Sequence, residues 1–396
     1  MTGILHSMRM WLITTAFAFS PLAVVGQPVT DDDPFRGEPL GLRPQVEIRA
    51  MIDGGPELTM PRSVLADSLH IYVLDPASFG VHRFDRAGAW LSTIGAEGDG
   101  PGEFRRLDGM GWRSDTLWVS DGRLARLSFF DRDGVLLRSV RLSVADGSVS
   151  WRPSGVLGAR ITGSFGLSPD LAAATDSIPI AVFDEDGTVA DTLAWRITGR
   201  GVVSFRTASR QSSLQYPFDR RGLMAFDPRR RWLYLATWRV GATGADRLEL
   251  VRITAAGDTA ARMTLPLGRI PVSARDVRSY ARAQYEERPE RMRSGLSVED
   301  MVQAFLRHHE NPSETHVDAM IASEEGTLWL RKTDRTADGA PQRWAGYEPD
   351  AGFLGFVQFP PGHQLLAAAD GLLWTRGEGA FGLPTITGWE IARRTP

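Results

Sequence analysis

Cysteine is absent from this sequence of 396 residues. Its absence excludes disulfides, thiol catalysis, thiolate-bound metals and a lipid-modified cysteine, so stability has to come from packing. Lysine and asparagine occur once each, as Lys332 and Asn311, so nearly all of the positive charge is arginine. With 45 basic and 48 acidic residues the formal charge is −3. Because binding to nucleic-acid phosphates requires a marked basic excess, we expect no nucleic-acid partner.

Long apolar runs are missing as well. The apolar run at residues 11–19 is too short for a membrane helix, which needs about 20 apolar residues. It follows Arg9 and precedes small residues that end at Gly26, which is the pattern of a secretory signal peptide. We therefore expect residues 1–26 to be a signal peptide and the mature chain to be periplasmic or secreted, without stable membrane insertion. A buried first helix is the alternative, and the acidic, proline-containing residues 27–44 predict a flexible leader.

Two parts of the chain nearly superimpose on each other. Residues 67–75 and 81–88 match residues 115–121 and 127–134, including an aromatic residue twelve positions before the Phe of a Phe-Asp-Arg-x-Gly turn. Glycine in such a turn supplies the positive φ of a tight hairpin, and the alternating segments around it are typical of half-buried strands. Weaker copies extend the pattern to six units near residues 61–94, 107–141, 148–196, 220–265, 316–359 and 363–393.

The repeat predicts an all-β fold, a six-bladed β-propeller over residues 45–396. One four-stranded unit cannot bury both of its faces, whereas radial stacking buries the aromatic residues between neighbouring units. The last unit has three good strands, so we expect residues 46–52 to supply its outer strand by pairing with residues 387–392. Five or seven blades remain alternatives, because the third unit lacks its aromatic residue at 156–158.

A glycine-rich motif, Gly98-Asp-Gly-Pro-Gly-Glu-Phe104, lies between the first two units. In this motif the chain resembles secreted bacterial six-bladed propellers related to NHL repeats, whose Gly-x-Gly-Pro-Gly-Glu-Phe signature closes one blade and opens the next. The resemblance covers roughly residues 45–393 and implies the fold and export, but no catalytic residues. NHL arrays tend to repeat the motif, which occurs once here. Because a strand and not a helix follows it, the motif predicts a structural junction and not a phosphate-binding loop.

The alternating pattern stops at residues 271–311, between the fourth and fifth units. Ser273 and Ser297 each begin a capping pattern followed by apolar residues at helical spacing, which predicts a small helical insertion. If the strands of a blade are lettered a to d outward, all d-to-a connections emerge on one face of a propeller. The insertion, residues 197–219 and the glycine-rich junction are therefore expected at the same mouth of the channel. Long connections on a rigid scaffold are where binding is usually built.

This d–a mouth is predicted to bind a small polar or anionic ligand. The candidate binding residues are cationic or aromatic side chains on the three connections: Arg105, Arg106, Arg200, Arg206, Arg210, Tyr216, His308 and His309. A decorative cap, with the arginines paired to glutamates of the helices, is the competing interpretation of the insertion. A scaffold that binds a protein partner on the propeller rim is a further alternative.

A metal-dependent enzyme, a lactone hydrolase or lyase with a divalent cation in the channel, is the alternative function. His316 and His363 each lie near the start of an innermost strand and are the candidate metal ligands. Two histidines fall short of the three protein ligands of catalytic zinc. The single asparagine also does not suit the calcium centre that a resemblance to gluconolactonase-like propellers would imply. No Gly-x-Ser-x-Gly motif is present either. We therefore expect a binding protein without a catalytic residue or cofactor, with a divalent metal as the alternative.

Overall fold

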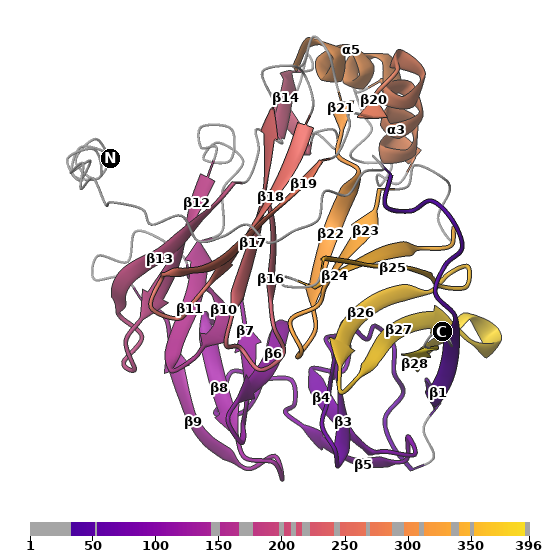
Figure 1. Ribbon diagram of the computed structural model, residues 1–396. Coiled ribbons are helices and arrows are strands. Elements are labelled where there is room, and N and C mark those ends of the chain that lie inside the picture. Colours follow the sequence, from indigo (N-terminus) through magenta and orange to yellow (C-terminus); the bar gives the residue numbers. More distant parts are fainter. Residues whose placement is uncertain are drawn as a thin grey trace.

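The structure is a computed structural model that describes thirteen segments of the chain. These are residues 33–51, 54–143, 151–165, 177–197, 202–206, 211–215, 222–240, 246–266, 270–286, 297–308, 313–333, 340–348 and 352–392. Six four-stranded sheets form the ring of a six-bladed β-propeller (Figure 1). The blade number predicted from the repeat is therefore correct.

Five blades consist of four strands that follow one another in the chain. Blade one contains β2 (Ser63–Ala66), β3 (His70–Asp75), β4 (Gly80–Asp85) and β5 (Trp90–Ile94). Blade two contains β6 (Leu107–Arg113), β7 (Thr116–Asp121), β8 (Arg126–Phe130) and β9 (Leu136–Arg141). Blade three contains β10 (Trp151–Leu157), β11 (Arg160–Phe165), β12 (Ser177–Phe183) and β13 (Val189–Ile197). Blade four contains β16 (Leu223–Phe226), β17 (Leu233–Val240), β18 (Asp246–Ile253) and β19 (Thr259–Pro266). Blade five contains β22 (Val317–Ala322), β23 (Leu328–Lys332), β24 (Arg343–Glu348) and β25 (Gly352–Gln358).

Blade six takes its strands from both ends of the chain. It contains β26 (Gln364–Ala369), β27 (Leu372–Glu378), β28 (Pro384–Ile391) and, outermost, β1 (Leu42–Arg49). The predicted pairing of an N-terminal strand with the last strand is confirmed: Glu47 lies opposite Thr387 and Ile48 opposite Ile386. The observed strand begins and ends earlier than the predicted 46–52. Ile48 is buried between blades six and one, so this strand closes the ring.

Apart from one short turn, the remaining elements lie on two d-to-a connections. Between blades three and four, β14 (Val202–Arg206) pairs with β15 (Gln211–Gln215). Between blades four and five follow β20 (Ile270–Pro271), α3 (Ala274–Glu286), α5 (Val298–His308) and β21 (Ser313–Glu314). A short 3₁₀ turn, η1 (Ala380–Gly382), joins β27 to β28. None of the helices in the described segments is long and apolar enough to cross a membrane.

Each pair of adjacent blades encloses its own hydrophobic core. In five blades an aromatic residue of strand b is buried in such a core: Tyr72, Trp118, Tyr234, Trp329 and Trp374. Blade three has Thr162 on its strand b, β11, whereas residues 156–158 belong to the end of β10 and the turn after it. The indole of Trp118 packs so closely on Gly155 of β10 that a Cβ there would lie 2.5 Å from the ring. Trp118 thus packs against blade three, and the core between blades three and four is the one without a strand-b aromatic residue.

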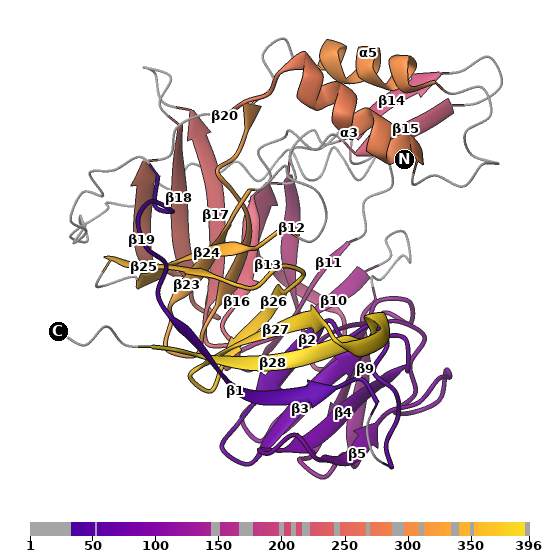
Figure 2. The ribbon, with the colours of Figure 1, turned by 90° about the vertical axis from the view of Figure 1, so that its right-hand side faces the viewer.

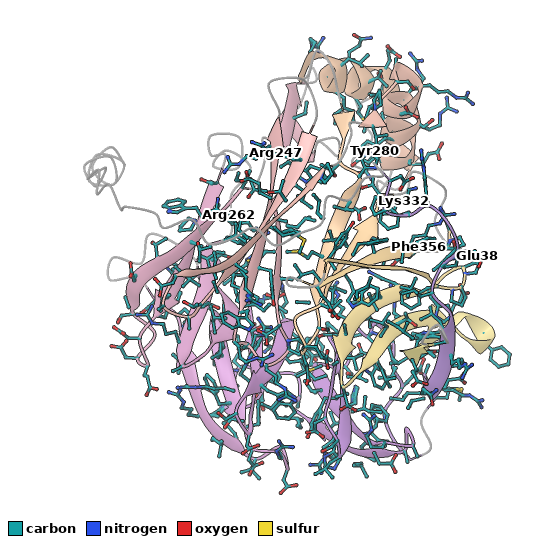
Figure 3. The ribbon with its side chains drawn as sticks, viewed as in Figure 1. Glu38, Arg247, Arg262, Tyr280, Lys332 and Phe356 are labelled. Carbon is teal, nitrogen blue, oxygen red and sulfur yellow. The ribbon has the colours of Figure 1, made fainter. Side chains whose placement is uncertain are left out.

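The described part of the predicted leader is packed on blade five. Phe35 is 3% exposed and meets Phe356 edge-on at 6.1 Å between ring centres. Lys332 Nζ lies 3.4 Å from Asp33 Oδ2 and 5.3 Å from the centre of the Phe35 ring. Lys332 and Phe356 are labelled in Figure 3. The backbone N–H of Leu40 donates to the Phe356 carbonyl at 2.7 Å. A solvated, flexible leader therefore does not describe these residues, because a buried ring and an ion pair hold them.

Candidate functional site

The two d-to-a connections that carry regular elements come together at one end of the molecule. Helix α3 packs against α5, and α5 packs against β14 (Figure 2). We call these two helices and the β14–β15 hairpin the cap. In both views the cap lies at the top of the molecule, away from β5 of blade one. The glycine-rich junction that follows β5 is the third connection expected at this mouth, and the structure joins only the other two in the cap.

Both helices of the cap begin where the sequence predicts. Asp276 Oδ2 accepts from the Ser273 N–H at 2.8 Å, and Ser273 Oγ accepts from the Asp276 N–H at 3.2 Å. Ser297 and Asp300 form the same pair of bonds, each at 3.1 Å. These reciprocal bonds satisfy N–H groups that the first helical turn leaves without an intrahelical partner. Each helix therefore has a defined start that its own sequence supplies.

The cap has a hydrophobic core of its own, separate from the six interblade cores. Its buried members come from both connections: Val203, Val272, Val277, Ala281, Met301, Val302, Ala304 and Phe305. The rings of Tyr280 and Phe305 are tilted at 59° to each other with 5.7 Å between their centres, a contact that joins the two helices. At the base of the cap, Ile270 pairs with Glu314 and Pro271 with Ser313. The insertion therefore leaves and re-enters the propeller through one narrow, paired neck.

The glycine-rich segment is a junction between strands β5 and β6, as predicted, and it is closed by bonds of its own. Phe104 is fully buried, and its ring packs on Gly95, where φ is +92° and a Cβ would lie 2.4 Å away. The Glu103 carboxylate accepts from the Gly100 N–H at 2.8 Å. The Phe104 N–H donates to the Ala96 carbonyl at 2.7 Å. The glycines are thus required for close packing within the loop, and the backbone groups named here are already bonded inside it.

Two of the predicted ligand-binding arginines have carboxylate partners beside them in the chain. Arg105 Nε donates to Asp99 at 2.8 Å and its Nη1 to Glu97 at 3.2 Å. Arg106 Nε donates to Asp108 at 2.8 Å. Both pairs are partly exposed, so water screens them and each adds little stability. Their arrangement fits a role within the junction better than an anion site shared with the cap.

Two of the other predicted residues end elements of the cap. Arg206 is the last residue of β14, opposite Gln211, and His308 is the last residue of α5. Four more lie outside the described residues: Arg200, Arg210, Tyr216 and His309. The described segments thus place two predicted positions on cap elements, and ligand binding by them stays a prediction.

Of the two predicted metal-ligand histidines, His316 is bonded within blade five through its backbone, and the ring of His363 is bonded within blade six. The His316 carbonyl accepts from the Thr333 N–H at 2.8 Å. His363 Nδ1 is 3.0 Å from Thr375 Oγ1, and its ring meets Trp389 edge-on at 5.6 Å. Among the described residues, no group of three or more His, Asp or Glu side chains is arranged to hold a metal ion. A narrow pocket between blades four and five, lined by Tyr234, Arg252 and Met263 among others, has a volume of about 20 Å³, the space of about one water molecule.

The buried His82 of β4 connects strands within its own blade. Its Nε2 is 2.8 Å from Ser78 Oγ and its Nδ1 is 2.9 Å from Thr93 Oγ1. Blade two has Ser128 and Ser139 in the corresponding cross-strand pair, with their hydroxyl oxygens 3.0 Å apart. Because the neighbouring blade makes the same link with two serines, a structural role explains His82 without catalysis.

The burial of His82 predicts a pH dependence of folding. Burial lowers the pKa of His82 below its ordinary 6.5, against a smaller opposing effect of Asp75. Below pH 6.5 the unfolded chain therefore binds a proton that the folded chain takes up only at lower pH. The free energy of unfolding therefore decreases as the pH is lowered through that window. One such group contributes at most about 1.4 kcal/mol per pH unit. Urea unfolding between pH 7 and pH 5 should show a steeper loss for wild type and His70→Gln than for His82→Gln. Equal slopes for all three proteins would contradict this explanation.

Solved structures match this chain over most of its length. A member of the DUF4221 family from Bacteroides vulgatus is 10% identical with a TM-score of 0.52, over 90% of this chain and 99% of that chain. A Bacteroides fragilis protein described as exported is 10% identical with a TM-score of 0.43, over 89% and 96%. The PQQ-bound aldose sugar dehydrogenase of Streptomyces coelicolor is 12% identical with a TM-score of 0.42, over 89% and 99%. No family model and no curated protein matches the sequence. The first similarity supports the propeller fold, and none of them brings an activity to this chain.

Proposed function

We propose that this chain is an exported binding protein that takes a small polar or anionic ligand at the d–a mouth of its propeller, beneath the cap. The main support for this proposal is that two d-to-a connections share one hydrophobic core. The ring is complete without them, since the six interblade cores and the β1–β28 pairing close it. An ordered element that closure does not require is available for recognition. Export is supported by the signal-like residues 1–26.

The anionic character of the ligand rests on the cationic positions of the cap. Arg206 and His308 end two elements that pack together, β14 and α5. Charge-assisted hydrogen bonds from such side chains are the usual means of binding carboxylates and phosphates. Arg105 and Arg106 are left out of this site, because nearby carboxylates already accept their hydrogen bonds.

The neck of the insertion allows the cap to be removed without cutting a blade. Because Pro271 and Ser313 are paired, replacing residues 272–312 by Asn-Gly should join β20 and β21 in a tight hairpin. A Val203→Ser substitution would remove an apolar side chain that this excision exposes. We expect the excised protein to keep the β-sheet circular dichroism of wild type, because each interblade core is intact.

A thermal-shift screen of small carboxylates, phosphates and sulfonates then tests the function. A ligand at 100 times its Kd stabilises the native state by about 2.7 kcal/mol, so at least one anion should raise the melting temperature of wild type by several degrees. The excised protein should not respond to that anion. The proposal is wrong if no anion stabilises wild type, or if wild type and excised protein respond equally.

A further inference from the structure

Helix α3 of the cap carries three arginines on one side. Arg275, Arg278 and Arg282 are all exposed. Their spacings of three and four residues place them above one another along the helix, because an α-helix has about 3.6 residues per turn. We call these three side chains the arginine row. It extends over about 10 Å of helix axis, at about 1.5 Å per residue. In both views α3 lies with the rest of the cap at the top of the molecule (Figure 1, Figure 2).

The buried side of α3 fixes the position of the arginine row. Val277 and Ala281 are fully buried in the cap core. The ring contact of Tyr280 with Phe305 joins α3 to α5. The reciprocal bonds that begin at Ser273 fix the first turn of the helix. The backbone beneath the row is therefore held in place, and a partner would meet the arginines at a fixed spacing.

The arginine row has little counter-charge of its own. Among the residues that the structure describes, the guanidinium groups of Arg275 and Arg282 have no carboxylate partner and no hydrogen-bond acceptor. Arg278 Nη2 lies 3.7 Å from Glu299 Oε2 of α5, but the two side chains are 52% and 59% exposed, so water screens this pair. Most of the positive charge of the row is therefore available to a partner.

The arginine row also weakens the helix that carries it. Like charges three or four residues apart repel each other, as Arg278 does with both Arg275 and Arg282. Arg275 lies in the first turn of α3, where the helix dipole favours anions. The last turn, where the dipole favours cations, has no basic residue. Folding alone therefore gives no reason for arginine at these three positions. Residues that break a local rule without a structural gain are expected at functional sites.

The charges beside the arginine row favour a narrow anionic partner. Glu299 and Asp300 of α5 are exposed, and so is Glu286, the last residue of α3. A broad membrane surface with anionic lipids would meet these carboxylates together with the row. An extended polypeptide can meet the row alone. Its alternate side chains lie on one side about 6.7 Å apart, so carboxylates at three alternate positions span about 13 Å, which flexible arginine side chains on about 10 Å of helix can match.

We propose that the arginine row of α3 is a docking surface for an extended acidic segment of a partner protein. Each guanidinium donates to a carboxylate on alternate residues of that segment, in the bidentate geometry that arginine favours. The segment binds to the exposed side of the cap. The proposal therefore does not rest on the small-ligand site proposed beneath the cap.

Fluorescence anisotropy with a labelled peptide tests the docking surface. The probe is fluorescein-Gly-Ser-Glu-Ser-Glu-Ser-Glu-Ser-Gly, and its control peptide has Gln in place of each Glu. The full chain should bind the probe at physiological ionic strength and should not bind the control peptide. A row variant with Arg275→Gln, Arg278→Gln and Arg282→Gln should bind the probe about a hundredfold more weakly, since a charge-assisted hydrogen bond contributes roughly tenfold or more in affinity.

A ring variant with the same change in net charge is the matched control. It carries Arg43→Gln, Arg141→Gln and Arg262→Gln, which remove three exposed arginines from outer strands of blades six, two and four. Arg262 is labelled in Figure 3. The ring variant should bind the probe like wild type. The row variant should melt no lower than wild type, because repulsion within the helix is removed. It should also keep the thermal shift that wild type shows with a small anion, so the two proposals fail separately.

Four results would overturn the docking surface. Wild type does not distinguish the probe from the control peptide, or the row variant and the ring variant lose the same affinity, which is an effect of net charge only. The row variant melts several degrees below wild type, which makes the row a part of the fold. The row is needed for sedimentation with phosphatidylglycerol vesicles and not for binding of the probe, in which case the partner is a membrane.

Discussion

A chain without residues 1–49 is expected to aggregate. Strand β1 pairs with β28 through seven residue pairs, from Leu42 opposite Ile391 to Arg49 opposite Thr385. Its removal leaves β28 as an unpaired edge and opens the core between blades six and one, where Ile48 is 1% exposed. An exposed edge with a hydrophobic flank is a template for aggregation.

Size-exclusion chromatography and thermal melting of the purified protein measure this effect. A chain that lacks only residues 1–32 keeps β1 and is the control, expected to elute and melt like the full chain. A point variant gives the same information without truncation. Ile48→Asp places an unpaired charge in the core and should cost on the order of 3–5 kcal/mol, whereas Glu47→Ala on the exposed face should change stability by less than about 0.5 kcal/mol. If the chain without residues 1–49 elutes and melts like the full chain, β1 does not close the ring.

The limits of β1 show what the sequence pattern can and cannot predict. Alternation at Val46, Ile48 and Ala50 identified a spare strand, because one face of it is buried. The pattern did not indicate that the strand begins at Leu42, since Pro44 argues against a strand. Pro44 is tolerated because β1 is an outer strand and because the pairing has an irregularity between Pro44 and Val46. The first and last residues of a strand therefore depend on its position in the sheet, and the local sequence does not show that position.

In the candidate sites too, contacts between residues close in the sequence could be predicted, and contacts between blades could not. The serines that begin α3 and α5 were predictable because their bonds join residues three apart. Arg105 and Arg106 could have been recognised as paired from Asp99 and Asp108 nearby in the chain. The contacts of Arg230 could not have been predicted, since three consecutive arginines normally indicate an exposed charged turn. Its guanidinium lies 4.5 Å from the centre of the Trp118 ring of blade two, a contact between blades that the local sequence does not show.

Asp121 is expected to contribute more to folding than any predicted ligand-binding residue. Its carboxylate, at the end of β7, is fully buried. It accepts from the backbone N–H groups of Arg105 at 2.6 Å and Arg106 at 3.1 Å, and from those of Arg123 and Leu124 at 2.8 Å each. One side chain thus binds the glycine-rich junction to the turn after strand b. In blade one Asp75 does the same: it accepts from the N–H groups of Thr59 at 2.7 Å and Ala77 at 2.9 Å.

Asp121→Ala should therefore lower the free energy of unfolding by about 3–5 kcal/mol, because it leaves backbone donors in a buried place without an acceptor. Asp121→Asn keeps one oxygen and turns an amide toward two of the N–H groups, so its loss should be smaller but of the same sign. Asp115→Ala is the matched control: this carboxylate is 85% exposed and pairs with Arg132 at 2.8 Å, and its loss should cost no more than about 1 kcal/mol. Urea unfolding followed by tryptophan fluorescence measures all three variants. If Asp121→Ala unfolds at the same urea concentration as Asp115→Ala, the junction is held by the packing of Phe104 on Gly95 and not by the buried carboxylate.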